Sequence, residues 1–174
     1  FWFERGEPHP AAVAAVDAIA SALEHALDPS DYDAEKIQAE WSRTETATDV
    51  DSKERTLLDL AISIGVLREI QAVHRGRIDP RTLGWGFDVS PKALDRAALL
   101  REARDGAGVA PLLERLEPAF PHYKRNRKML AHYRDLAAAG EPELVPELPK
   151  NRRKVAPGDV WEGVPQLTAR LRVL

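Results

Sequence analysis

The stretch DSKERTLLDLAISIGVLREIQAVHRGR (residues 51–77) is the most apolar segment of the sequence, and it decides the fold. Apolar side chains recur along it at helical spacing, at Leu57, Leu60, Ala61, Ile64, Leu67 and Ile70. Asp51 and Glu54 have the spacing of a capping box, which predicts that a helix begins here. The apolar pattern fades at residues 74–77. We expect this helix to form the centre of the core, with the six-residue stripe buried.

The helical period continues on both sides of this segment. It predicts helices over residues 10–26, about 34–41, 92–105, 110–117, 123–139 and 164–171. Residues 43–51 are polar and typical of a turn, and residues 78–91 form a long connection around Trp85. Ser90 and Pro91 fit the N-cap and first position of the helix that follows, which Gly106 would end. Few aromatic residues and many Ala and Leu also favour helices.

The sequence therefore predicts an all-α fold. We expect an irregular multi-helix scaffold domain with long Pro- and Gly-containing loops over residues 1–140. Residues 141–158 carry four prolines and several basic residues without a helical period, which is typical of a linker. Residues 159–174 would then be the start of a small, incomplete helical module.

Composition excludes several classes of protein. The 174 residues carry a formal net charge of −3, which argues against a general polyanion binder. There is no cysteine, so the chain itself offers no disulfide, thiolate ligand or Cys nucleophile. No apolar run approaches the roughly 20 residues of a membrane span.

No pattern in the sequence indicates a catalytic, cofactor or metal site. The five histidines form no metal-binding motif, and we interpret them as surface or helix-end residues. The serines lie in no nucleophile signature, and the glycines in no phosphate-binding loop. We therefore predict no catalytic residue, no metal ligand and no cofactor in this chain.

Two basic clusters remain as candidate contact surfaces. They lie at residues 124–128 and 150–154, and the simpler interpretation is a solvated helix face and a solvated linker. The functional alternative is an acidic polymer partner. Nucleic acid is disfavoured because no aromatic side chains alternate with the charges. The residues that we predict to contact such a partner are Lys124, Arg125, Arg127, Lys128, Arg152 and Arg153.

The order of several short motifs resembles one known family. Leu-Asp-Pro-x-x-Tyr stands at residues 27–32, Gly-Arg-Ile-Asp-Pro at 76–80, and Leu-x-Pro-x-x-x-x-Tyr at 116–123. This series resembles the N-terminal scaffold region of the large Gram-negative L,D-transpeptidases, enzymes that cross-link peptidoglycan. One departure is Ala26, where the family often has Gly. The tail resembles the opening of a peptidoglycan-binding helical module, through Gly158, Asp159, Val164, Leu167, Arg170 and Leu171.

The resemblance implies a non-catalytic role for this chain. The catalytic domain of the family carries a Ser-x-Gly-Cys signature whose thiolate attacks the donor peptide, and this chain has no cysteine. We thus expect the scaffold and peptidoglycan-binding part of a periplasmic L,D-transpeptidase involved in cell-wall cross-linking. Its expected partners are peptidoglycan and a C-terminal catalytic domain of the same polypeptide. A secretion signal or anchor upstream of Phe1 would have been removed.

Two other functions stay open at this point. The first is a free-standing helical domain that binds a protein partner and has no cell-wall role. The second is a small nucleic-acid binder that uses the two basic clusters, which the net charge disfavours.

Overall fold

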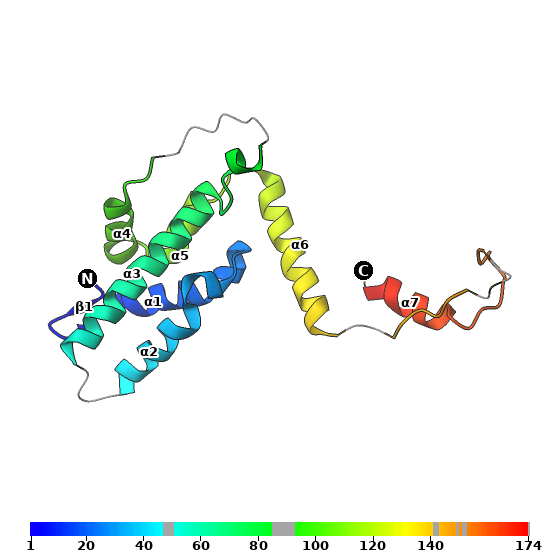
Figure 1. Cartoon of the computed structure of the whole chain (residues 1–174), viewed down its shortest axis with the longest axis horizontal. Coiled ribbons are helices and arrows are strands. Elements are labelled where there is room, and N and C mark those ends of the chain that lie inside the picture. Colours follow the sequence, from blue (N-terminus) through cyan, green and yellow to red (C-terminus); the bar gives the residue numbers. More distant parts are fainter. Residues whose placement is uncertain (47–50, 85–92, 141–142, 149, 151–152, 174) are drawn as a thin grey trace. The chain divides into compact units, whose positions relative to one another are not determined.

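The computed structural model describes residues 1–46, 51–84, 93–140, 143–148, 150 and 153–173. The chain forms two compact units, residues 1–127 and 128–174, and we describe each by itself. Within the described residues the fold is all-α, as predicted, with one short hairpin of β1 (Phe3–Glu4) and β2 (Glu7–Pro8) (Figure 1). The helices are α1 (Pro10–Ala20), α2 (Ala34–Thr46), α3 (Ser52–Arg75), α4 (Arg96–Asp105), α5 (Val109–Leu116), α6 (Pro121–Ala138) and α7 (Val164–Val173). Short 3₁₀ turns are η1 (Ala22–His25), η2 (Pro29–Tyr32) and η3 (Pro80–Leu83).

Side-chain caps explain where the main helices begin. Asp51 accepts a hydrogen bond from the backbone N–H of Lys53 at the start of α3, which confirms the predicted N-terminus. Glu54 does not complete a capping box, because its carboxylate pairs with Arg43 of α2 at 3.2 Å. The His9 side chain caps α1 in the same way, just before Pro10.

The core of the first unit forms around α3. This helix packs against α1, α2 and α5, and α1 also packs against α2. The contact between α1 and α3 is closest at a glycine of α3. A Cβ atom at Gly65 would lie 2.7 Å from Cδ1 of Ile19 on α1, which is too close for two carbon atoms. Ile19 and Ile62 are fully buried beside it. The absence of a side chain at Gly65 therefore lets α1 and α3 approach closely.

The predicted core face of α3 is wrong. Leu57, Leu60 and Ile64 are about half exposed, whereas Ile70 alone of the six predicted residues is fully buried. Apolar side chains occur nearly all round this helix, so two stripes at helical spacing fit the sequence equally well. The buried stripe is the other one, because it contains the glycine that α1 requires: Leu58, Ile62, Gly65, Val66, Glu69, Ile70 and Val73.

Several predicted helix ends also differ from the structure. The helix predicted over residues 10–26 ends at Ala20 and continues as the tighter turn η1. Helix α2 extends to Thr46, five residues beyond its expected end, so the polar residues 43–46 are helical rather than a turn. Helix α4 begins at Arg96, capped by Asp95 through the N–H of Ala98. The predicted cap at Ser90 and Pro91 lies outside the described residues.

The second unit contains the end of α6 and α7. Leu130 and Tyr133 on α6 are exposed, and so are Val164, Leu167 and Leu171 on α7. Gly140, which we expected to end the helix, has a left-handed φ of 87° two residues beyond Ala138. The division into a scaffold domain, linker and module at residues 140 and 158 stays a prediction.

Candidate functional site

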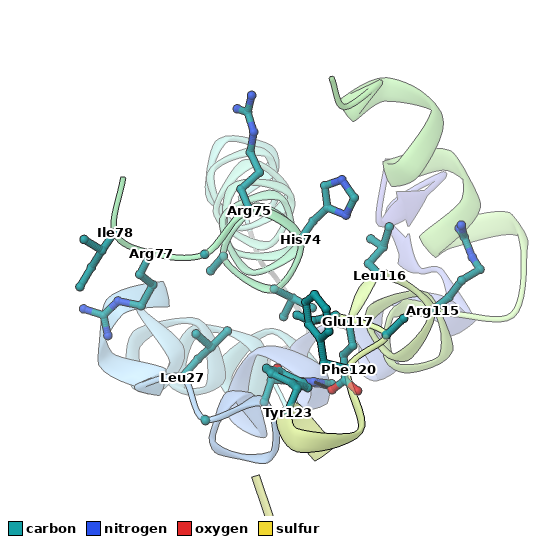
Figure 2. Close-up of a pocket in the computed structure, with 17 residues that line it drawn as sticks. Leu27, His74, Arg75, Arg77, Ile78, Arg115, Leu116, Glu117, Phe120 and Tyr123 are labelled. Carbon is teal, nitrogen blue, oxygen red and sulfur yellow. Dashed lines mark hydrogen bonds and ion pairs between the residues drawn. The ribbon is translucent and has the colours of Figure 1, made fainter. Parts of the chain in front are cut away.

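Three separate parts of the chain line one groove in the first unit (Figure 2). The groove has a volume of about 850 Å³. Residues 25–27 form one wall, the end of α3 with residues 76–78 another, and the connection from α5 into α6 the third. Each of the three motifs quoted from the sequence contributes to it: Leu27 from the first, Gly76, Arg77 and Ile78 from the second, and Leu116, Pro118, Phe120 and Tyr123 among others from the third.

Local backbone geometry places the first two walls. Ala26 ends η1 in the left-handed conformation, with φ of 61°, and this turn brings Leu27 inward, where it is buried. Helix α3 ends when the N–H of Gly76 bonds to the carbonyl of Ala72 and the chain turns with φ of 87°. A glycine suits that turn because side chains rarely adopt this φ. Asp79 then caps the short turn η3.

The third wall is the sharp connection between α5 and α6. Helix α5 ends at Leu116, where the N–H of Glu117 bonds to the carbonyl of Leu113. Pro118 cannot continue the helix. Helix α6 begins at Pro121, and Figure 2 shows Tyr123 and Phe120 turned toward the end of α3. Burial raises the pKa of the Tyr123 hydroxyl, so this hydroxyl stays neutral over the physiological range.

A buried ionic cluster ties the first wall to the third. Glu117 has only 3% of its side chain exposed and accepts two bonds, one from Nδ1 of His25 at 2.8 Å and one from the guanidinium of Arg127. Burial, followed by the positive charge of Arg127, lowers the pKa of His25. His25 is therefore neutral at pH 7, and its Nδ1–H donates to the carboxylate. The cluster joins η1, the end of α5 and α6.

The rest of the groove is apolar with a cationic rim. Leu27, Val73 and Leu116 supply apolar surface, and Phe120 is largely exposed above it. The arginines at the rim are Arg75, Arg77 and Arg115, and His74 lies among the lining residues beside them. Arg77 pairs with Asp31 at 2.7 Å and Arg115 with Glu102 at 2.6 Å. Figure 2 shows the guanidinium groups of Arg75 and Arg77 pointing away from the floor. This arrangement suits a ligand with both apolar and anionic parts.

The predicted contact residues lie in different environments. Lys124, Arg125 and Lys128 are exposed on α6, and Arg153 is exposed in the second unit. Arg127 is only a quarter exposed, because its guanidinium is held by Glu117. Arg152 lies outside the described residues. A role for these six residues in binding stays a prediction.

Sequence reasoning missed the ionic cluster. The sequence predicts His25 as a surface or helix-end residue; it does end η1, but it is buried. Glu117 carried no signal by itself. The one sequence feature that could have indicated the cluster is the position of its residues, since His25 lies just before the first motif and Glu117 lies inside the third.

Among the described residues, no group of His, Cys, Asp and Glu is arranged to hold a metal ion. No helix in the described part of the chain has the length and hydrophobicity needed to cross a membrane.

The cluster predicts a measurable cost for losing Glu117. Glu117→Gln keeps the shape of the side chain but leaves the charge of Arg127 without its partner in a largely buried site. We expect the free energy of unfolding to fall by about 2 kcal/mol, below the usual range for a broken buried pair because Arg127 can turn to solvent. Urea unfolding at pH 7 measures this.

A double-mutant cycle isolates the ion pair in that measurement. Arg127→Met removes the cation while keeping an apolar stem, and Glu117→Gln/Arg127→Met removes both charges. We expect the double variant to be more stable than the sum of the two single losses predicts, by roughly 1 kcal/mol or more. Strict additivity would mean that the two side chains do not interact in solution.

Comparisons with known proteins bear on this region. No curated protein and no solved structure matches the chain. The family model described as Scaffold domain matches residues 1–130. This match takes in all three motifs, the groove that they line and the ionic cluster beside it. Because it covers well over half of the 174 residues, the chain belongs to the Scaffold domain family.

Proposed function

We propose that this chain is the non-catalytic scaffold and peptidoglycan-binding part of a periplasmic L,D-transpeptidase involved in cell-wall cross-linking. One observation carries the proposal. The three motifs that resemble such enzymes lie up to about 100 residues apart in sequence, yet all three line one groove within the Scaffold domain match. A concave surface built from separate segments, apolar with a few polar groups, is typical of a ligand-binding site.

The proposal assigns binding to this chain and chemistry to another part of the polypeptide. The groove offers an apolar floor and a rim of basic side chains, of which Arg77 and Arg115 are paired with carboxylates and Arg75 is exposed. The peptides of peptidoglycan combine aliphatic segments with carboxylates, which fits both features. A thiolate that attacks the donor peptide would belong to the catalytic domain, which is the proposed partner within the same protein.

The exposed cations are a separate part of the proposal. Lys124 and Arg125 lie in the first unit, Lys128 and Arg153 lie in the second, and none of them is part of the Glu117 cluster. Each contact of this kind contributes little in water, roughly 0.2–1 kcal/mol. Several acting together on a polyanionic sacculus would give useful affinity that weakens as salt rises.

Pelleting with purified sacculi tests the proposal. At low salt we expect the variant Lys124→Glu/Arg125→Glu/Lys128→Glu and the groove variant Arg75→Glu each to reduce the bound fraction. The triple variant should lose at least about fivefold in affinity. Lys36→Glu on α2 is the matched control, because Lys36 is also an exposed helical lysine, and it should pellet like the unmodified chain.

Two outcomes would contradict the proposal. The first is that the unmodified chain does not pellet with sacculi above the level of an unrelated protein of similar charge. The second is that the triple and groove variants pellet as well as the Lys36→Glu control.

The alternative function, a free-standing domain that binds a protein partner, is favoured by a separate feature. This feature is the row of exposed apolar side chains on α3 at Leu57, Leu60 and Ile64.

A further inference from the structure

We infer that the exposed face of α3 is a docking surface for a partner helix whose own apolar stripe is bordered by acidic side chains. This face lies opposite the buried side of the helix. It consists of Leu57, Leu60 and Ile64, none of which lines the groove, although Arg75 at the end of α3 borders both surfaces. We call these three residues the α3 stripe.

The α3 stripe is apolar surface left in water at regular spacing. Leu57 is 58% exposed, Leu60 52% and Ile64 54%. Positions three and four residues apart lie on one face of a helix, so the three side chains form a continuous row. Leu67, which is partly buried, extends the row by one more turn. Single exposed apolar residues are ordinary, but an aligned row along a central helix is typical of an interaction site.

The charges that border the row are mostly positive. The helical period places Lys53, Arg68 and Arg75 on the same side of α3 as the stripe. Every residue of α3 is described, and each of its three acidic residues is engaged or buried. Glu54, one turn before Leu57, pairs with Arg43 of α2, Asp59 accepts a hydrogen bond from the N–H of Trp2, and Glu69 is buried. Arg68 reaches an acidic neighbour, Asp33, only at 3.5 Å, with both side chains exposed. A partner with acidic borders therefore complements this face.

The same charges disfavour a second copy of this chain as the partner. An antiparallel pair of α3 helices in contact through Ile64 would bring Lys53 against Arg75 of the other copy. A parallel pair would set each cation beside its own equivalent. Like charges placed directly opposite one another repel, so self-association through this face is unfavourable in either orientation.

The shape of the row favours a helix over a lipid surface. The three side chains follow α3 for about 11 Å at 1.5 Å per residue. Neighbouring side chains already cover nearly half of each one. A row of this kind packs into the groove between two ridges of side chains on another helix. The side chains that make such helix–helix contacts are spaced by three and four residues. Insertion into lipid relies instead on side chains that protrude fully, often aromatic ones.

A designed peptide provides the test. The chain has no cysteine, so Gln71→Cys on the exposed side of α3 gives a single site for an environment-sensitive fluorophore. The first probe is a helical peptide of about 18 residues with leucines at three- and four-residue spacing and glutamates bordering them. The second has lysine in place of every glutamate. We expect the acidic peptide to bind with an affinity near micromolar, given so small an interface, and the basic peptide to bind at least about tenfold more weakly.

Variants locate the binding. Leu60→Glu places a charge in the row and should weaken the acidic peptide at least about tenfold. Val13→Glu is the matched control on α1, because Val13 is similarly exposed, and it should bind like the unmodified chain. Lys53→Glu/Arg75→Glu should weaken binding several-fold and reduce its dependence on salt. Lys53 and Arg75 are both exposed, so this double variant should fold normally.

The remaining outcomes overturn the inference. Equal binding of the acidic and basic peptides, or binding that Leu60→Glu leaves unchanged, would show that the row does not select an acidic helix. Sedimentation equilibrium that detects a dimer abolished by Leu60→Glu would assign the face to a second copy. Flotation with phosphatidylglycerol vesicles that depends on the stripe would assign it to lipid. A failure of the acidic peptide to bind at all would remove the proposed site.

Discussion

Replacing Glu69 with leucine is expected to raise the free energy of unfolding by about 3 kcal/mol at pH 7. Glu69 lies on the buried side of α3 with none of its surface exposed, and neither of its carboxyl oxygens has a hydrogen-bond partner among the described residues. Loss of hydration raises the pKa of this carboxyl from 4.5 to about 8. The folded protein therefore holds a proton at pH 7 that the unfolded chain has released.

The sign of the effect follows from this proton. Because the folded state binds it more tightly, the contribution of Glu69 to stability is greatest below pH 4.5 and is lost as the pH rises to about 8. The loss is about 1.4 kcal/mol for each pH unit between 4.5 and 7. Leucine removes both this loss and the buried oxygen atoms at a similar side-chain volume.

Urea unfolding at several pH values between 5 and 8 measures the effect. The stability difference between Glu69→Leu and the unmodified chain should grow with pH. Glu69→Gln is the control, since it keeps the shape and the polar atoms but does not ionise. Its difference from the unmodified chain should grow with the same slope, while it remains less stable than the leucine variant. A difference that stays constant with pH would contradict a raised pKa.

Replacing Trp2 with alanine is expected to lower the free energy of unfolding by about 3–5 kcal/mol. Trp2 is fully buried, although it lies next to the first residue of the sequence. Its Nε1–H donates to Oγ of Ser63 on α3 at 2.9 Å, and its carbonyl accepts the N–H of His9 at 2.8 Å. Truncation would leave a large cavity beside α3 and remove the donor to Ser63.

Thermal unfolding followed by circular dichroism measures this loss. For a protein of this size we expect the melting temperature to fall by about 10 °C or more. Ser63→Ala separates the hydrogen bond from the packing, and should cost only about 1 kcal/mol. A melting temperature for Trp2→Ala within a few degrees of the unmodified chain would show that the indole is not part of the core in solution.

The all-α fold and most helix positions could be predicted from the sequence because caps and breakers are local. Asp51 at the start of α3 and Gly140 after α6 act on residues within a few positions of themselves. The buried face of α3 could not be predicted. Its selection depends on the contact of Gly65 with Ile19, which joins two helices more than 40 residues apart in sequence.

The groove shows the same division between local and distant effects. Each of its motifs contains a turn signal, which is an Asp-Pro pair in the first two and the prolines Pro118 and Pro121 in the third. Their convergence is not visible, and neither is the pairing of His25 with Glu117, which lie 92 residues apart. A buried charge cluster is a property of the packed fold, so the residues that form it look like ordinary polar residues in the sequence.

Ala26 has a consequence for how related chains are recognised. It keeps a left-handed backbone without a glycine, a conformation that costs an ordinary residue roughly 1–2 kcal/mol. Packing of its neighbour Leu27 and the bond from the N–H of Leu27 to the carbonyl of Ala22 hold the turn in place. Exchanging alanine and glycine at this position therefore changes the free energy of the turn, whereas the course of the backbone stays the same. A motif written with an obligatory glycine here would pass over chains that share the same groove.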